Sequence, residues 1–218
     1  MQLPNVQEGD TIVFSTPPAK DIKKLLSVLK VKVVLRKLAQ AKNEILVSGG
    51  GADGLKALLP QLSPKSPVDH VVPKPDCSQQ LWICGDFSLR LVSWAEDLFQ
   101  ELARGKHPLC VIDGHHVTLR SGAEETVELA RKARKAGKQL TDYPKAHFSP
   151  RELVSELVRI SPETRYVFTS HLKGQGVTTE ERAQYESFPQ VVKVMGRTDT
   201  PANQRYLLSL ARKLYTSA

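Results

Sequence analysis

The stretch Glu44-Ile45-Leu46-Val47-Ser48-Gly49-Gly50-Gly51-Ala52-Asp53-Gly54-Leu55 joins an apolar run to a glycine-rich turn. The apolar part predicts a buried strand over Glu44–Ser48, and residues 55–62 predict a short helix. Glycines at such a junction let the backbone turn sharply and let a ligand approach the amides, while the following helix start favours an anion. A purely structural connector has the same composition, so both interpretations stand. No Gly-Lys-Ser/Thr follows, which excludes a Walker loop.

Apolar runs and helical periodicities alternate on both sides of this stretch. Strands are predicted at residues 11–14, 68–72, 81–84, 109–113 and 139–143, and helices at 19–41, 89–104 and 123–136. Within 19–41 the β-branched Val31, Val33 and Val34 also fit a strand over Lys32–Leu38, which would form a hairpin with Glu44–Ser48; we favour the helix. The alternation predicts an α/β protein with a Rossmann-like parallel sheet and flanking helices.

The pattern changes after Pro144. Ser149 followed by Pro150 and Glu152 predicts a helix that opens with a capping box. Strands at 165–170 and 191–195 and helices at 178–185 and 201–215 follow. We therefore divide the chain into a Rossmann-like domain over residues 1–145 and a small C-terminal α/β extension over 146–218, which extends the same sheet and domain or forms a small lobe.

A second loop, Leu119-Arg120-Ser121-Gly122-Ala123-Glu124, lies between the apolar strand Leu109–Asp113 and a helix. Ser121 and Glu124 have capping-box spacing, which gives the loop a structural explanation. The functional interpretation is a second helix start that binds an anion with help from Arg120. Both loops are expected at the carboxyl ends of parallel strands, where open α/β sheets bind ligands, and Asp113 at its strand end is a further candidate ligand contact.

Together the two loops resemble the SLOG superfamily of Rossmann-like proteins. The turn Ser48–Leu55 looks like that superfamily's glycine-rich signature. The run Leu109–Asp113, then Arg120-Ser121-Gly122, a helix, Gly137-Lys138 and Pro144, is similar to the DNA-processing protein A branch. Lys56 stands where the family has an acid after the turn, and Arg90 is the nearest candidate for an arginine of the family's Arg-Asn-Arg run. The Pro-Gly-Gly-x-Gly-Thr loop of the nucleotide-hydrolysing branch is missing, which counts against a glycosidase.

The charge of the chain supports an anionic partner. Its 218 residues include 31 Lys and Arg against 23 Asp and Glu, for a net charge of +8. The excess falls on the two flanks, with net +5 over residues 1–75, −1 over 76–144 and +4 over 145–218. In the first flank the cations gather in one predicted helix, where a solvated helix face is the alternative to a phosphate contact. The candidate nucleic-acid-binding residues there are Lys20, Lys23, Lys24, Lys30 and Lys37.

The candidate ligand- and phosphate-binding residues come from the two loops and the strand ends before them. They are Ser48, Gly49, Gly50, Gly51, Asp53, Gly54, Asp113, Arg120, Ser121 and Gly122. No catalytic residue, cofactor or metal is expected. Asp113-Gly114-His115-His116 contains metal-ligand residue types, but adjacent histidines after a strand point to opposite sides and Asp113 is the one nearby acid. Three sparse cysteines and the absence of a signal-peptide pattern or an apolar span predict a cytoplasmic protein.

Two classes of function follow. The resemblance to the DNA-processing protein A branch implies a non-enzymatic protein that binds single-stranded DNA in recombination or DNA uptake, with a recombinase as partner. Both a monomer and a homodimer are compatible with the sequence. The second class is a nucleotide-binding SLOG protein, either a sensor of a nucleotide or a nucleoside-phosphate hydrolase. An interaction module that kept the fold and lost the ligand is a third interpretation.

Overall fold

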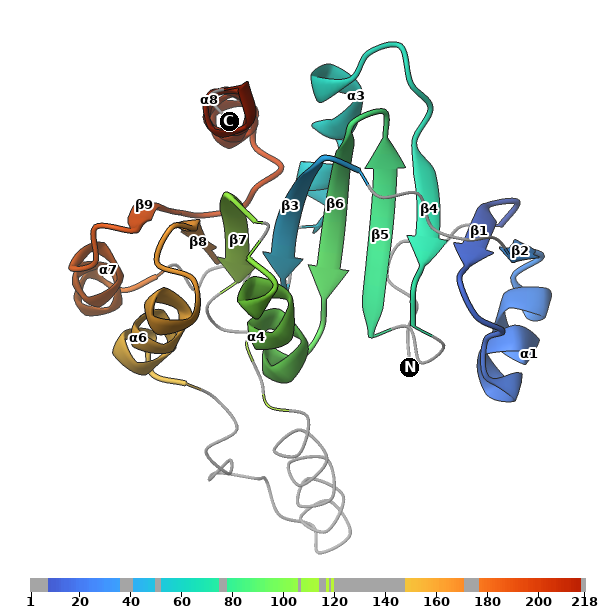
Figure 1. The fold of residues 1–218 in the computed structure, drawn as a ribbon, viewed down its shortest axis with the longest axis horizontal. Helices are drawn as coiled ribbons and strands as arrows, with labels where there is room; N and C mark the ends of the chain where they lie inside the picture. Colours follow the sequence, from blue (N-terminus) through green and yellow to red (C-terminus); the bar gives the residue numbers. More distant parts are fainter. Residues whose placement is uncertain are drawn as a thin grey trace, which may run out of the picture.

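A computed structural model describes residues 8–35, 41–49, 52–74, 78–105, 107–113, 117, 119, 148–170 and 177–216. Nine strands form one sheet in the order β2-β1-β4-β5-β6-β3-β7-β8-β9 (Figure 1). The strands are β1 (Thr11–Phe14), β2 (Lys32–Leu35), β3 (Asn43–Ser48), β4 (Asp69–Val72), β5 (Gln79–Cys84), β6 (Phe87–Val92), β7 (Leu109–Asp113), β8 (Arg165–Thr169) and β9 (Val191–Met195). The α/β fold with a mostly parallel sheet is confirmed.

Only β5 runs against the other strands of this sheet, as Figure 1 shows. β5 and β6 form a hairpin in which Cys84 pairs with Phe87. The turn between them contains Gly85 at φ +59°, a backbone conformation that glycine adopts at no steric cost. All other pairings are parallel, so the carboxyl ends of the remaining eight strands share one edge of the sheet.

Helices cover both faces of the sheet. The described helices are α1 (Lys20–Val28), α2 (Ala52–Lys56), α3 (Leu59–Leu62), α4 (Ala95–Ala103), α6 (Pro150–Ile160), α7 (Thr179–Glu186) and α8 (Pro201–Thr216). Apolar side chains of α2, α3 and α8 pack on one face, and those of α4, α6 and α7 pack on the other. α1 lies on the same face as α2, α3 and α8. It packs on Ile12, whose paired residue His70 is in turn paired with Trp82, and paired residues share a face of the sheet. Trp82 belongs to the core beneath α8. None of the described helices is long and apolar enough to cross a membrane.

The predicted helix over residues 19–41 is wrong beyond Val28. α1 ends there, Lys30 adopts φ +53°, and the chain then forms β2 with Val33 and Val34. The β-branched side chains thus lie in a strand, as the alternative prediction of a strand beginning at Lys32 stated. The expected hairpin with β3 is also wrong, because β2 pairs in parallel with β1 at the far edge of the sheet.

Two other helix predictions merged separate elements. Residues 89–104 contain the end of β6 and all of α4, because Leu89 and Leu91 alternate onto one face of the sheet before the chain turns at Ser93. Residues 55–62 contain the end of α2 and all of α3, with Pro60 in the first turn of α3. Proline removes a backbone donor and disfavours a continuous helix through that point.

The remaining secondary-structure predictions within the described residues are confirmed, with bounds that shift by one or two residues. The strands at Thr11–Phe14, Asp69–Val72, Leu81–Cys84 and Leu109–Asp113 form, and the C-terminal strands and helices form as expected. Ser149 and Glu152 make the predicted capping box. β8 pairs with β7 and β9 with β8, so the C-terminal segment extends the same sheet. The predicted helix 123–136 and strand 139–143 lie outside the described residues.

Gly54 is required by close packing. A Cβ at this position would lie 2.5 Å from the Thr198 hydroxyl and 2.7 Å from the Asp199 backbone nitrogen. We expect Gly54→Ala to destabilise the protein by about 1–3 kcal/mol, since the turn at 198–199 must move to admit the methyl group. Urea unfolding measures the change.

Gly196 provides the control for that measurement. It lies between β9 and α8, in the same connection as Thr198 and Asp199, and a Cβ there would meet nothing within 4 Å. Gly196→Ala should therefore change the unfolding free energy by less than about 0.5 kcal/mol. Equal unfolding midpoints for the two variants would contradict the packing role of Gly54.

Candidate functional site

The structure places two predicted site residues at the ends of neighbouring strands, at the carboxyl edge of the sheet. β3 ends at Ser48 and β7 at Asp113, and these strands are parallel neighbours in which Ser48 pairs with Ile112. The Gly49 backbone N–H donates to the carbonyl of Val92, at the end of β6, over 3.4 Å. The expectation that the strands before the two loops are parallel is confirmed, and β3 and β7 are in addition direct neighbours.

These strand-end side chains are buried. The exposed fraction is 1% for Ser48 and 0% for Asp113, and Thr198 at 0% closes over Gly54. The described part of the edge is therefore a packed polar layer rather than an open cleft. Predicted site residues that lie outside the described part are Gly50, Gly51, Arg120, Ser121, Gly122, Lys37 and the side chain of Asp53.

The predicted lysines of α1 are exposed. Lys20, Lys23 and Lys24 occupy positions i, i+3 and i+4, which share one side of a helix, while Ile22 and Leu26 on the other side are buried against β1. Because α1 follows the carboxyl end of β1, its first turn lies toward the same edge as Ser48 and Asp113. Lys30 differs from the other lysines, since its ammonium forms an ion pair with Glu8 at 2.7 Å.

The described helices of the two layers carry opposite net charge. The sequences of α1, α2, α3 and α8 contain seven basic and two acidic residues, net +5. Those of α4, α6 and α7 contain three basic and eight acidic residues, net −5. We name the first set the basic layer and the second the acidic layer. Sequence reasoning found the two basic flanks but missed that the sheet separates charge by face, because helices distant in the sequence share a layer.

A buried ion network that sequence reasoning also missed lies between α4 and the sheet. Arg90 of β6 makes a bidentate contact with Glu44 of β3 through one edge of its guanidinium, from Nε to Oε1 at 2.8 Å and from Nη2 to Oε2 at 3.0 Å. Glu101 of α4 accepts hydrogen bonds from Arg104 at 2.6 Å and from Gln79 at 3.2 Å. Arg90, considered from the sequence as a family arginine, is thus an interior ion-pair partner.

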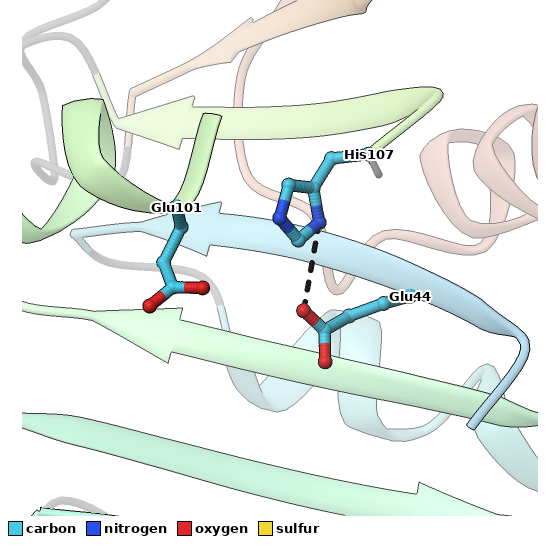
Figure 2. Close-up of side chains that lie close together, drawn as sticks. All are labelled: Glu44, Glu101 and His107. Atoms are coloured by element: carbon cyan, nitrogen blue, oxygen red, sulfur yellow. Dashed lines mark ion pairs between the residues drawn. The ribbon is translucent and has the colours of Figure 1, made fainter. Parts of the chain in front are cut away.

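His107 completes this network (Figure 2). Its Nδ1 lies 3.5 Å from Oε1 of Glu44, and its side chain is only 3% exposed. Ligand atoms of Glu44, Glu101 and His107 all lie within 4.8 Å of one another, the arrangement that could hold a metal ion. Two guanidiniums already neutralise the two carboxylates, however, and a divalent cation would have to displace Arg90 from Glu44. The donor set therefore fits an internal ion network better than a metal centre.

Burial lowers the pKa of His107 below its ordinary value, although Glu44 and Glu101 act in the opposite direction. The unfolded chain therefore binds this proton more tightly than the folded chain does. The resulting stabilisation is present above pH 6.5 and is lost as the pH falls below that value. Burial also lowers the pKa of His70 to about 4, with the same sign.

We expect His107→Gln to reduce the acid sensitivity of the fold. One histidine that stays neutral in the folded state contributes at most about 1.4 kcal/mol of lost stability per pH unit. Urea unfolding at pH 7, 6 and 5 should show a smaller decline in the variant than in the wild type. The matched variant His70→Gln should retain the His107 contribution, and an unchanged decline in His107→Gln would refute this role.

No protein-family model matches the chain, and no curated protein matches it. A solved structure with a similar fold is the Sar1-type small COPII coat GTPase, an ADP-ribosylation-factor-like GTP-binding protein of Encephalitozoon cuniculi, in complex with GDP. It is 14% identical with a TM-score of 0.41, and the match covers 82% of this chain and 84% of that chain. No function follows from a likeness of this degree. The class of fold is plain from the sheet itself: a mostly parallel α/β sheet between two helix layers.

Proposed function

We propose that the protein binds nucleic acid through the exposed lysines of α1, with single-stranded DNA as the class that the resemblance to the DNA-processing protein A branch implies. The single observation that supports this proposal is the cluster of Lys20, Lys23 and Lys24 on one exposed side of α1. Lysines so placed contact the phosphate backbone and release its counterions without reading sequence.

The surroundings of α1 favour this function over a small-ligand pocket. The strand-end candidates Ser48 and Asp113 are buried, whereas the lysines reach solvent. Asp21 is the only acid within α1. α1 also belongs to the basic layer, and the eight acidic residues of the acidic layer lie on helices across the sheet. A polyanion on the basic layer therefore avoids most of the negative charge carried by the described helices.

The test is the triple variant Lys20→Gln, Lys23→Gln and Lys24→Gln, measured by fluorescence anisotropy with dT20 and with a 20-base-pair duplex. Three lost phosphate contacts should lower the affinity for dT20 about 10- to 100-fold at 0.1 M salt. The slope of log affinity against log salt should become shallower by about 2. An affinity that is independent of salt, or unchanged in the variant, would overturn the proposal.

A matched control separates a local contact from total charge. Arg151→Gln, Arg159→Gln and Arg182→Gln together remove the same charge from exposed positions of the acidic layer. This control should bind dT20 to within about threefold of the wild type, because exposed charges farther apart than a Debye length are largely screened. Thermal melting checks that it folds, since Arg182 donates a hydrogen bond to the Val194 carbonyl at 3.0 Å.

A nucleotide is the second candidate ligand, favoured by the adjacency of Ser48 and Asp113 at the ends of β3 and β7. Ligands of open α/β sheets bind outside such strand ends. A nucleotide at 100 times its Kd would stabilise the fold by about 2.7 kcal/mol. A thermal-shift panel of nucleoside mono-, di- and triphosphates should then show a stabilisation that Asp113→Asn reduces. A flat panel would remove this candidate and leave the nucleic-acid proposal standing.

A further inference from the structure

The last helix, α8, has an unusually one-sided charge for its length. Its 16 residues include Arg205, Arg212 and Lys213 and no acidic residue. All three cationic side chains are exposed. The inner side of α8 carries Leu207, Ala211 and Tyr215, which are buried in the core. α8 therefore combines an apolar side on the sheet with a basic side toward solvent.

Hydrogen bonds fix the course of α8 across the sheet. Near its start, the Tyr206 hydroxyl donates to the carbonyl of Val192 in β9 at 3.2 Å. Near its end, the Tyr215 hydroxyl donates to the carbonyl of Glu44 in β3 at 2.5 Å. Arg212 also donates to the carbonyl of Gln61 in α3 at 3.1 Å. The helix thus runs from the β9 edge toward β3, and its basic residues are held in a fixed position on the basic layer.

Further cations accompany α8 on this layer. Lys193 of β9 pairs with Val167, whose side chain belongs to the α8-side core, and its ammonium lies 5.6 Å from the centre of the Tyr206 ring. The nearest acid before α8 in the sequence, Asp199, forms an ion pair with Arg197. α8 itself contains no acidic residue that would offset the charge of its three cations.

The distance from α8 to α1 suits a polymer and not a single small anion. β3, which the end of α8 contacts, and β1, which supports α1, are separated by four strand spacings in the sheet order. At about 4.8 Å per spacing, these two strands lie about 19 Å apart across the sheet. The end of α8 contacts the start of β3, whereas the first turn of α1 follows the end of β1, so the two clusters are also displaced along the strands. A strand of nucleic acid crosses such a distance with several phosphates, within the ~4–16 nucleotides that single-strand-binding folds occupy.

We propose that Arg205, Arg212 and Lys213 of α8 form a second contact surface for single-stranded nucleic acid, and that one strand lies across the basic layer from α1 to α8. This inference rests on the proposed function and adds the route that the bound strand takes across the protein. Phosphates supply the binding energy at both ends, and the strand between them follows the layer without base-specific contacts.

The test uses the full chain and the variant Arg205→Gln, Arg212→Gln and Lys213→Gln in the dT20 anisotropy assay. The expected result is an affinity lowered about 10- to 100-fold at 0.1 M salt and a salt slope shallower by about 2. Combined with the α1 triple variant, the two reductions in slope should add to about 4, because the clusters contact different phosphates of one strand. The acidic-layer triple variant is again the matched control.

A second variant protects the test against loss of folding. Arg205→Gln with Lys213→Gln keeps the bond from Arg212 to α3 and should lower the salt slope by about 1.4. If the α1 variant weakens binding and both α8 variants bind as the wild type does, the inference is overturned and the proposed function stands. If the α1 variant also binds as the wild type does, both fail. If the acidic-layer control lost as much affinity for dT20 as the α8 variants, the proposed route of the strand would also be overturned, because total charge would then explain the effect.

Discussion

Eight strands that run in one direction constrain the whole molecule. Each parallel pairing needs a crossover that returns the chain to the start of the next strand, and the crossovers cover both faces of the sheet. The sheet interior is therefore apolar on both sides, with one core against each helix layer. Chemistry is confined to the strand ends and to the outer sides of the helices. The candidate residues at the strand ends, Ser48 and Asp113, are buried, and exposed lysines and arginines lie on the outer sides of the described helices.

The ion network between α4 and the sheet is balanced in charge. Glu44 and Glu101 face Arg90 and Arg104, and His107 stays neutral because burial lowers its pKa. Such a network contributes little net stability, but removing one partner leaves a buried charge and costs about 3–5 kcal/mol. It connects α4 with β3 and β6 through directional contacts, so it fixes the position of the helix beyond what Leu98 and Leu102 achieve by apolar packing.

The sequence predicted elements well where one local signal acted alone. The apolar runs 109–113 and 191–195 and the capping box at Ser149 needed no knowledge of distant residues. It failed where two signals overlapped: Leu89 and Leu91 fit a helical spacing but alternate in a strand, and the valines after Lys30 pair with β1. Ser48 and Asp113 were placed correctly because parallel strands share an edge. The network around Glu44 was not predictable, since its members come from β3, β6, α4 and the loop before β7.

The described residues that follow the glycine-rich turn are engaged within the protein itself. Its helix places Leu55 in the core at 1% exposure, and the next residue, Lys56, holds its ammonium 5.7 Å from the centre of the Trp82 ring. Gly54 faces the protein's own turn at Thr198. The described residues Gly54, Leu55 and Lys56 thus make contacts within the protein, and the Lys56 ammonium lies over an indole. Cations that reach solvent without acidic neighbours on their own helix are those of α8, and α1 has a single acid beside its three lysines. The proposed phosphate-bearing polymer would contact both helices at once.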